Sequence, residues 1–85
     1  MKITFTANAL KSYQKLPITL KKKADKQFSF FVTNIHHPSL RIKKMAGMDR
    51  WEARIDRSYR FTFEKDEDSI TVRTIGQHDE GLGKK

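Results

Sequence analysis

The chain has 85 residues, no cysteine, and 18 lysine and arginine residues against 10 aspartate and glutamate residues, a net charge of +8. A chain of this length forms one domain, and without cysteine it holds neither a disulfide framework nor a thiolate zinc site. It has no apolar run near the roughly 18 residues of a membrane helix. The first residues also lack the apolar core of a signal peptide, so we expect a cytoplasmic protein. The surplus of positive charge predicts a polyanionic partner, with nucleic acid as the first expectation.

The positive charge is concentrated in residues 1–60, which carry 14 basic and 4 acidic side chains, whereas residues 61–85 carry 4 and 6. One group of basic residues consists of lysines: Lys11, Lys15, Lys21, Lys22, Lys23 and Lys26. The other is mostly arginine: Arg41, Lys43, Lys44, Arg50, Arg54, Arg57 and Arg60. We interpret the lysines as a solvated helix face. The planar guanidinium fork suits bidentate phosphate contacts, so we interpret the second group as facing a ligand.

The N-terminal half predicts a short strand followed by two helices. Residues 2–5 alternate polar and apolar side chains, and Thr6 is a good N-cap for a helix that begins near Ala7. Pro17 ends this helix and suits the start of the next one. The second helix has an apolar stripe with steps of four, four, three and four residues: Leu20, Ala24, Phe28, Phe31 and Ile35. The two helices therefore form an antiparallel hairpin.

The C-terminal half predicts a three-stranded meander after a basic, partly extended connector at residues 40–45. Alternating apolar residues mark strands that begin at Trp51 and Tyr59, with a tight connection at residues 56–58. An acidic turn at residues 66–68 precedes a last strand at residues 70–75. The predicted order is β-α-α-β-β-β, an α+β domain whose antiparallel sheet packs on the helical hairpin. We assign residues 1–80 to this domain and residues 81–85 to a flexible tail.

Alternation along the strands places Glu52, Arg54 and Arg60 on the sheet face away from the helices, with Arg73 beside them and His78 just beyond. Such a set is sufficient for metal-independent RNA cleavage. Glu52 would take the proton of the attacking 2′-hydroxyl, His78 would protonate the leaving 5′-oxygen, and arginines would stabilise the charged intermediate. The alternative is that Glu52 only pairs with an arginine and that His78 is a surface residue. Further basic residues are expected to contact RNA: Arg41, Lys43, Lys44, Arg50, Arg57 and Arg73.

Other chemistry finds little support in the sequence. His36 and His37 with His78 lack the spacing of metal ligands, so we expect neither a metal site nor a cofactor. Ser39 and Ser58 lack a histidine and an acid in a triad arrangement. No glycine-rich phosphate loop is present.

An ordered series of motifs resembles the RelE/ParE superfamily of toxins from type II toxin–antitoxin systems. The resemblance runs nearly end to end and includes the break at Leu16-Pro17. Its motifs are His37-Pro38-Ser39-Leu40-Arg41, Lys43-Lys44-Met45-Ala46-Gly47, Trp51-Glu52-Ala53-Arg54-Ile55, Ser58-Tyr59-Arg60-Phe61-Thr62-Phe63 and Ile75-Gly76-Gln77-His78-Asp79.

The resemblance implies the RelE-like fold and a partner antitoxin. In RelE-like members it also implies cleavage of messenger RNA on the ribosome. Arg60 matches the arginine that contacts the scissile phosphate, Arg54 matches a basic position, and His78 falls near the catalytic histidine of YoeB-like members. Glu52 departs from the family pattern, because it stands where RelE has a lysine. Two alternatives stay open: a ParE-like inhibitor of DNA gyrase without nuclease activity, and an inactive member bound to its antitoxin.

Overall fold

The computed structural model describes residues 2–47 and 49–77, and its elements follow the predicted order with two additions. The additions are a 3-10 turn, η1, and a two-residue strand, β2, within the connector that was predicted to be partly extended. The elements are β1 (Lys2–Phe5), α1 (Ala7–Gln14), α2 (Ile18–Thr33), η1 (Pro38–Leu40), β2 (Lys43–Lys44), β3 (Trp51–Arg54), β4 (Tyr59–Lys65) and β5 (Ser69–Gln77). The predicted tail at residues 81–85 and the predicted site residue His78 lie outside the described residues.

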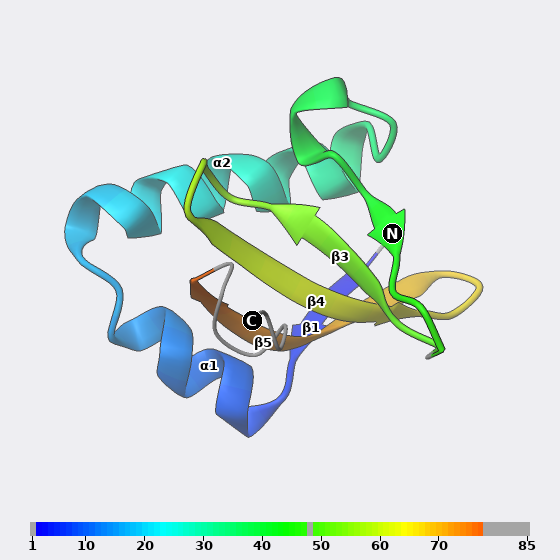
Figure 1. The fold of residues 1–85 in the computed structure, drawn as a ribbon, viewed down its shortest axis with the longest axis horizontal. Helices are drawn as coiled ribbons and strands as arrows, with labels where there is room; N and C mark the ends of the chain where they lie inside the picture. Colours follow the sequence, from blue (N-terminus) through cyan, green and yellow to red (C-terminus); the bar gives the residue numbers. More distant parts are fainter. Residues whose placement is uncertain (1, 48, 78–85) are drawn as a thin grey trace.

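The five strands form one sheet in the order β1-β5-β4-β3-β2 (Figure 1). β3, β4 and β5 pair antiparallel, as predicted for the meander, and β2 adds a further antiparallel strand beside β3. β1, however, pairs parallel with β5, with Ile3 opposite Ile70, so the predicted α+β fold is confirmed with a mixed sheet, and the prediction of an antiparallel sheet was wrong only at β1. The helices carry the chain across to the far edge of the sheet, and the meander then returns until β5 lies beside β1 in the same direction.

The residues that the sequence predicts at the start of each helix lie there in the structure. Thr6 caps α1, because its hydroxyl oxygen accepts a hydrogen bond from the amide of Ala9 at 3.1 Å. Pro17 lies directly before α2, where its missing N–H costs nothing. α2 ends at Thr33, so Ile35, the last residue of the predicted stripe, packs against the core from the following loop.

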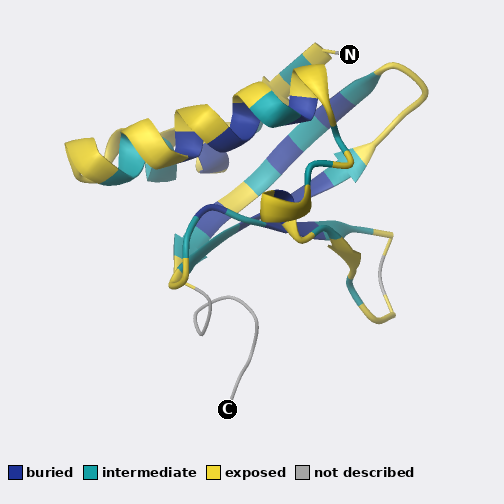
Figure 2. Cartoon of the chain, turned by 90° about the horizontal axis from the view of Figure 1, so that it is seen from above, coloured by how far each residue is buried: buried dark blue, intermediate teal, exposed yellow. Residues whose placement is uncertain are grey.

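Both helices pack on one face of the sheet and bury an aromatic core. Phe28 and Phe31 of α2 lie edge-on to Phe61 of β4, with ring centroids 5.0 and 5.2 Å apart, and Phe31 also meets Phe63 at 4.8 Å. Figure 2 shows the buried residues of α2 turned toward the sheet and its exposed residues turned away. The lysine-rich side of α2 therefore lies in solvent, as the sequence predicted.

The face of the sheet turned away from the helices carries polar side chains. Thr62 of β4 lies opposite Thr74 of β5, and their hydroxyl oxygens are 2.6 Å apart. A register irregularity follows at Thr62 and Phe63, where one extra residue of β5 is accommodated. This face and the turn between β3 and β4 hold most of the predicted site residues.

Candidate nucleic-acid interface

Arg54 and Arg60 lie directly opposite each other on β3 and β4, as the predicted hairpin required. Both guanidinium groups bind main-chain carbonyls of the connecting turn. Arg54 Nε and Arg60 Nη1 donate to the same oxygen, that of Asp56, at 3.2 and 2.7 Å. Arg60 Nη1 also donates to the carbonyls of Arg57 and Tyr59. Each guanidinium group is thereby held in place by one of its nitrogens, which leaves the N–H donors of the other two for a ligand.

Asp56 shapes the turn that these arginines hold. Its Oδ1 accepts hydrogen bonds from the amides of Ser58 and Tyr59, each at 2.9 Å, and its Oδ2 lies 3.5 Å from Lys23 Nζ. Partial burial acts to raise the pKa of Asp56, but these two amides and the Lys23 ammonium outweigh it and hold the pKa below its ordinary value. The carboxylate is therefore ionised at neutral pH, and both of its oxygens already have partners in the fold.

Arg41 and Arg57 join this pair, and we name Arg41, Arg54, Arg57 and Arg60 the arginine site. Arg41, Arg54 and Arg57 line a depression of about 410 Å³ beside η1 and the β3–β4 turn. Desolvation lowers the pKa of Arg54, and the positive charges of Arg41, Arg60 and Arg57 lower it further. Four guanidinium groups that repel one another, with one engaged carboxylate among them, form a site that an anion would stabilise.

Gln27 positions the arginine site from the helix side. Its side chain is 6% exposed, and its Nε2 donates to the carbonyl of Arg54 at 2.8 Å and to that of Ser39 at 3.2 Å. One amide thus connects α2, η1 and the end of β3. The sequence analysis missed this residue, although its signal was present: a glutamine three residues after Ala24 and four before Phe31 falls inside the apolar stripe.

The structure places Glu52 differently from the prediction of an uncovered carboxylate beside arginines. Glu52 is 3% exposed, and its Oε1 lies 3.7 Å from Lys43 Nζ. The reason is β2, which pairs Lys43 with Glu52 and so makes β3 an inner strand. Glu52 therefore matches the alternative interpretation of a paired carboxylate, with lysine in place of arginine.

Three other residues predicted to contact RNA instead contact side chains outside the arginine site. Arg60 lies opposite Gly76, whereas Arg73 lies three residues before Gly76 in β5 and does not join the arginine site. Glu64 instead bridges Arg73 and Arg50, at 3.6 and 3.5 Å. Lys44 lies near the Trp51 ring, on the other face of the sheet.

The histidines form no metal centre in the described part of the chain. His37 stacks on Phe30 with a ring separation of 3.8 Å, and its Nδ1 lies 2.9 Å from the Ser39 hydroxyl. Within residues 2–47 and 49–77, no group of three or more histidine, aspartate and glutamate side chains is placed to hold a metal ion. Neither helix of this part is long and apolar enough to cross a membrane.

Comparison with known proteins identifies the fold. No protein-family model and no curated protein matches the sequence. The YoeB/ParE toxin from Agrobacterium tumefaciens has a TM-score of 0.75 at 16% identity, over 92% of this chain and 99% of that one. The intact RelBE toxin–antitoxin complex of E. coli gives 0.70 at 22% identity, over 88% and 93%. The E. coli DinJ–YafQ toxin–antitoxin complex gives 0.74 at 11% identity, over 96% and 97%.

The chain has the RelE/ParE-like toxin fold. Its element order and mixed sheet match those of YoeB, YafQ and RelE toxins over nearly the whole chain. The resemblance of the sequence motifs is therefore confirmed at the level of the fold.

We predict that Asp56→Asn lowers the free energy of unfolding by about 1–2 kcal/mol at pH 7, the range for loss of a charged turn acceptor. The folded pKa of Asp56 lies below its ordinary value of 3.8, so the carboxylate stabilises the fold above that pH. This contribution fades as the pH falls below about 4 and through the folded pKa. Urea unfolding from pH 7 to 3 measures the difference. Asp66→Asn, in the exposed β4–β5 turn, is the control, and a gap between wild type and Asp56→Asn that stays constant with pH would contradict the prediction.

Proposed function

We propose that this protein is the toxin of a type II toxin–antitoxin system and cleaves messenger RNA on the ribosome. The observation that carries the proposal is the arginine site, where Arg41, Arg54, Arg57 and Arg60 converge around one engaged carboxylate. Cleavage of RNA next to a phosphate passes through an intermediate with additional negative charge. Fixed guanidinium forks at this place would stabilise that charge more than they stabilise the uncleaved strand.

The proposed reaction is attack of the 2′-oxygen on the adjacent phosphorus, with release of the 5′-oxygen of the next nucleotide. The 2′-hydroxyl loses its proton to a base, and the leaving oxygen gains one from an acid, so the products are a 2′,3′-cyclic phosphate and a 5′-hydroxyl. We assign the two proton-transfer roles to Glu52 and His78. Because Glu52 is buried on Lys43, the proposal includes alignment of the strand by the ribosome, which lowers the demand on the base.

A cleavage assay on programmed ribosomes tests the proposal. The purified protein is incubated with ribosomes that carry a defined message, with the same message alone, and with DNA gyrase acting on relaxed plasmid. We expect cleavage of the ribosome-bound message with cyclic phosphate ends, and unaffected supercoiling. An intact message at a tenfold excess of protein over ribosomes would reject the nuclease.

A ParE-like gyrase inhibitor is the second candidate, and the burial of Glu52 favours it. A carboxylate that is 3% exposed and ion-paired is a poor base, whereas a binding protein needs no base. In this case the arginine site binds an anionic surface of its target and catalyses no reaction. Inhibited supercoiling together with an intact message would select this candidate.

We propose that the antitoxin covers an apolar groove between the helices and β1. The groove has a volume of about 370 Å³, and its walls include Phe5, Leu10, Tyr13, Phe28 and Val32. Leu10 and Val32 are 46% and 49% exposed, which is unusual for large apolar side chains beside a basic helix. An acidic amphipathic segment fits this surface, because its apolar side would fill the groove and its carboxylates would face the lysines of α1 and α2.

We predict that the double variant Leu10→Glu/Val32→Glu binds the antitoxin at least 30-fold more weakly, the effect of losing one interface hot spot. Both side chains are half-exposed, so the fold should tolerate the change. The partner is the protein that copurifies with the untagged toxin, and calorimetry measures its affinity. Thr19→Glu, which adds one negative charge to the exposed first turn of α2, should bind within a few-fold of wild type. If the double variant binds the antitoxin as tightly as the wild type, the antitoxin binds another surface.

A further inference from the structure

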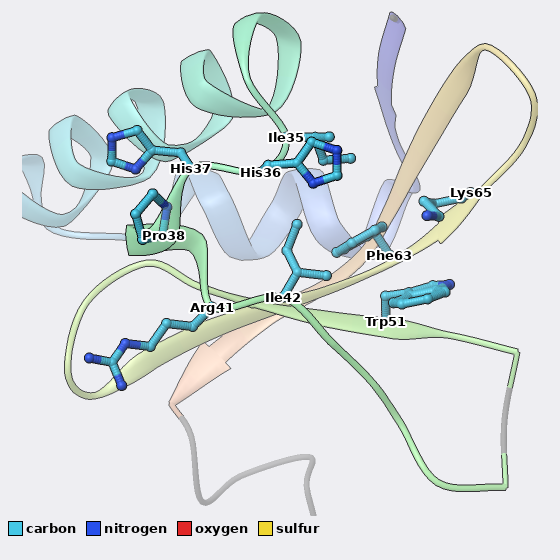
Figure 3. A pocket seen from close by; sticks show the side chains of 9 residues that line it. All are labelled: Ile35, His36, His37, Pro38, Arg41, Ile42, Trp51, Phe63 and Lys65. Carbon is cyan, nitrogen blue, oxygen red and sulfur yellow. The ribbon is translucent and has the colours of Figure 1, made fainter.

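A second pocket adjoins the arginine site on the helix side of the sheet. It has a volume of about 370 Å³, within the range of small-molecule sites, and Trp51 of β3 forms one wall. Phe63, which is fully buried, lies directly opposite Trp51 on β4. Figure 3 shows Ile35, Ile42, Phe63 and His36 directed toward one another, with the Trp51 ring at the far side.

Two lysines flank the indole. Lys65 Nζ lies 4.4 Å from the centroid of the Trp51 ring, and Lys44 Nζ lies 5.9 Å from it. Among residues 2–47 and 49–77, no carboxylate lies within ion-pair distance of either ammonium group. The pocket thus combines an aromatic surface with Lys65 in its lining and Lys44 beside the indole, two cations with no acidic partner among the described residues.

The pocket and the arginine site share two lining residues. Pro38 and Arg41 line both depressions, and the Arg41 side chain extends away from the indole (Figure 3). Along β3, the three residue steps from Trp51 to Arg54 span about 10 Å. The side chains of Trp51 and Arg54 lie on opposite faces of β3, so a single strand with a phosphate on the arginine site would reach Trp51 by way of Arg41, which lines both depressions.

We propose that this pocket binds one nucleobase of the RNA strand whose phosphate occupies the arginine site, an inference that rests on the proposed function. The base stacks on the Trp51 indole in place of the Lys65 ammonium, which lies over this ring in the free protein, and an adjoining phosphate binds the displaced Lys65 together with Lys44. The exposed imidazole of His36 faces the edge of the base. Aromatic stacking beside a cationic path is the general way in which proteins hold single-stranded nucleic acid.

The charge distribution favours a nucleotide over an apolar protein segment as the occupant. The groove at Leu10 and Val32 is lined mostly by apolar and aromatic side chains, and Asp25 is its one charged residue. The Trp51 pocket instead has cations at the rim, Lys65 and Arg41, around an apolar floor. A nucleotide matches both parts at once, because its base is flat and largely apolar on its faces and its phosphate is anionic.

The intrinsic fluorescence of the protein tests the proposal without any mutation, because Trp51 is the single tryptophan of the chain. The full chain is titrated at low salt with an adenosine pentaribonucleotide whose 2′-hydroxyls are methylated to prevent cleavage. The comparison strand has the same length and charge but abasic sugars, and its binding is measured by calorimetry. We expect strong quenching by the pentanucleotide, and binding without quenching by the abasic strand. Trp51→Leu should weaken binding of the pentanucleotide on the order of 5- to 150-fold and leave binding of the abasic strand unchanged.

The outcomes separate this inference from the proposed function. Arg60→Ala should weaken binding of both the pentanucleotide and the abasic strand. The pentanucleotide that does bind should still quench the fluorescence of Trp51. If both strands bind equally and neither quenches Trp51, the base pocket is overturned while phosphate binding at the arginine site stands. If neither strand binds, the base pocket is overturned, and the cleavage assay on programmed ribosomes decides the proposed function separately. Quenching by an acidic amphipathic peptide and not by the pentanucleotide would assign the pocket to a protein partner and overturn the base site.

Discussion

Under the proposed function, replacing Arg60 by alanine is expected to lower the rate of message cleavage on the ribosome by about 100- to 1,000-fold, the usual effect of removing one fixed group that stabilises transition-state charge. Arg60 lies opposite Arg54, and its Nη1 is fixed by three carbonyls of the β3–β4 turn. The guanidinium group is therefore held in position before substrate arrives, and little freedom remains to be lost in the transition state. A single-turnover assay on programmed ribosomes measures the rate.

Two companion variants separate charge, geometry and folding in this experiment. Arg60→Lys keeps the positive charge but loses the fork, so it should recover only part of the rate. Lys22→Ala removes one positive charge from the solvated face of α2 and should cleave within a few-fold of wild type. Because Arg60 also supports the turn, thermal unfolding of each variant must show a folded protein at the assay temperature. Full activity of a folded Arg60→Ala protein would remove the arginine site from the mechanism.

Replacing Phe31 by alanine is expected to lower the free energy of unfolding by about 3–5 kcal/mol, the range for truncating a buried aromatic residue. Phe31 is 2% exposed and meets Phe61 and Phe63 edge-on, so no neighbour can move into the space without breaking its own contacts. The loss would be a large part of the stability of a domain of this size. Urea unfolding at 25 °C measures it.

The neighbouring residue provides the control for this core variant. Val32 follows Phe31 on the same helix but is half-exposed, so Val32→Ala in the isolated toxin should lower the free energy of unfolding by less than about 1 kcal/mol. A similar loss for both variants would mean that helix propensity, and not the aromatic core, governs the result.

The local elements of this fold could be predicted because short-range chemistry determines them. Thr6 caps α1 and Pro17 precedes α2, since capping and proline effects act within a few residues. The period of two residues in β3 and β4 predicted that Arg54 and Arg60 share a face, and the tight turn brought them opposite each other. This pair is the part of the candidate site that the sequence located.

The other site residues depended on contacts between elements that are distant along the chain. β2 has only two residues, too few for a recognisable pattern, yet it turned Glu52 from an expected surface base into a buried partner of Lys43. Gln27 supports β3 and η1 across the layer between helix and sheet, which no local pattern reports. Glu64 holds Arg50 and Arg73 together because two strands bring them to one place.

The sequence by itself determined the excess of positive charge, the two helices, the meander and the arginine pair. These follow from composition and from periods of two or about 3.6 residues, which the backbone imposes locally. Only the tertiary structure decided that β1 runs parallel to β5, which arginines converge, and that Trp51 faces a pocket beside them. The physical reason is that burial and electrostatic pairing depend on distances through space, which the packing of helices on the sheet alone sets.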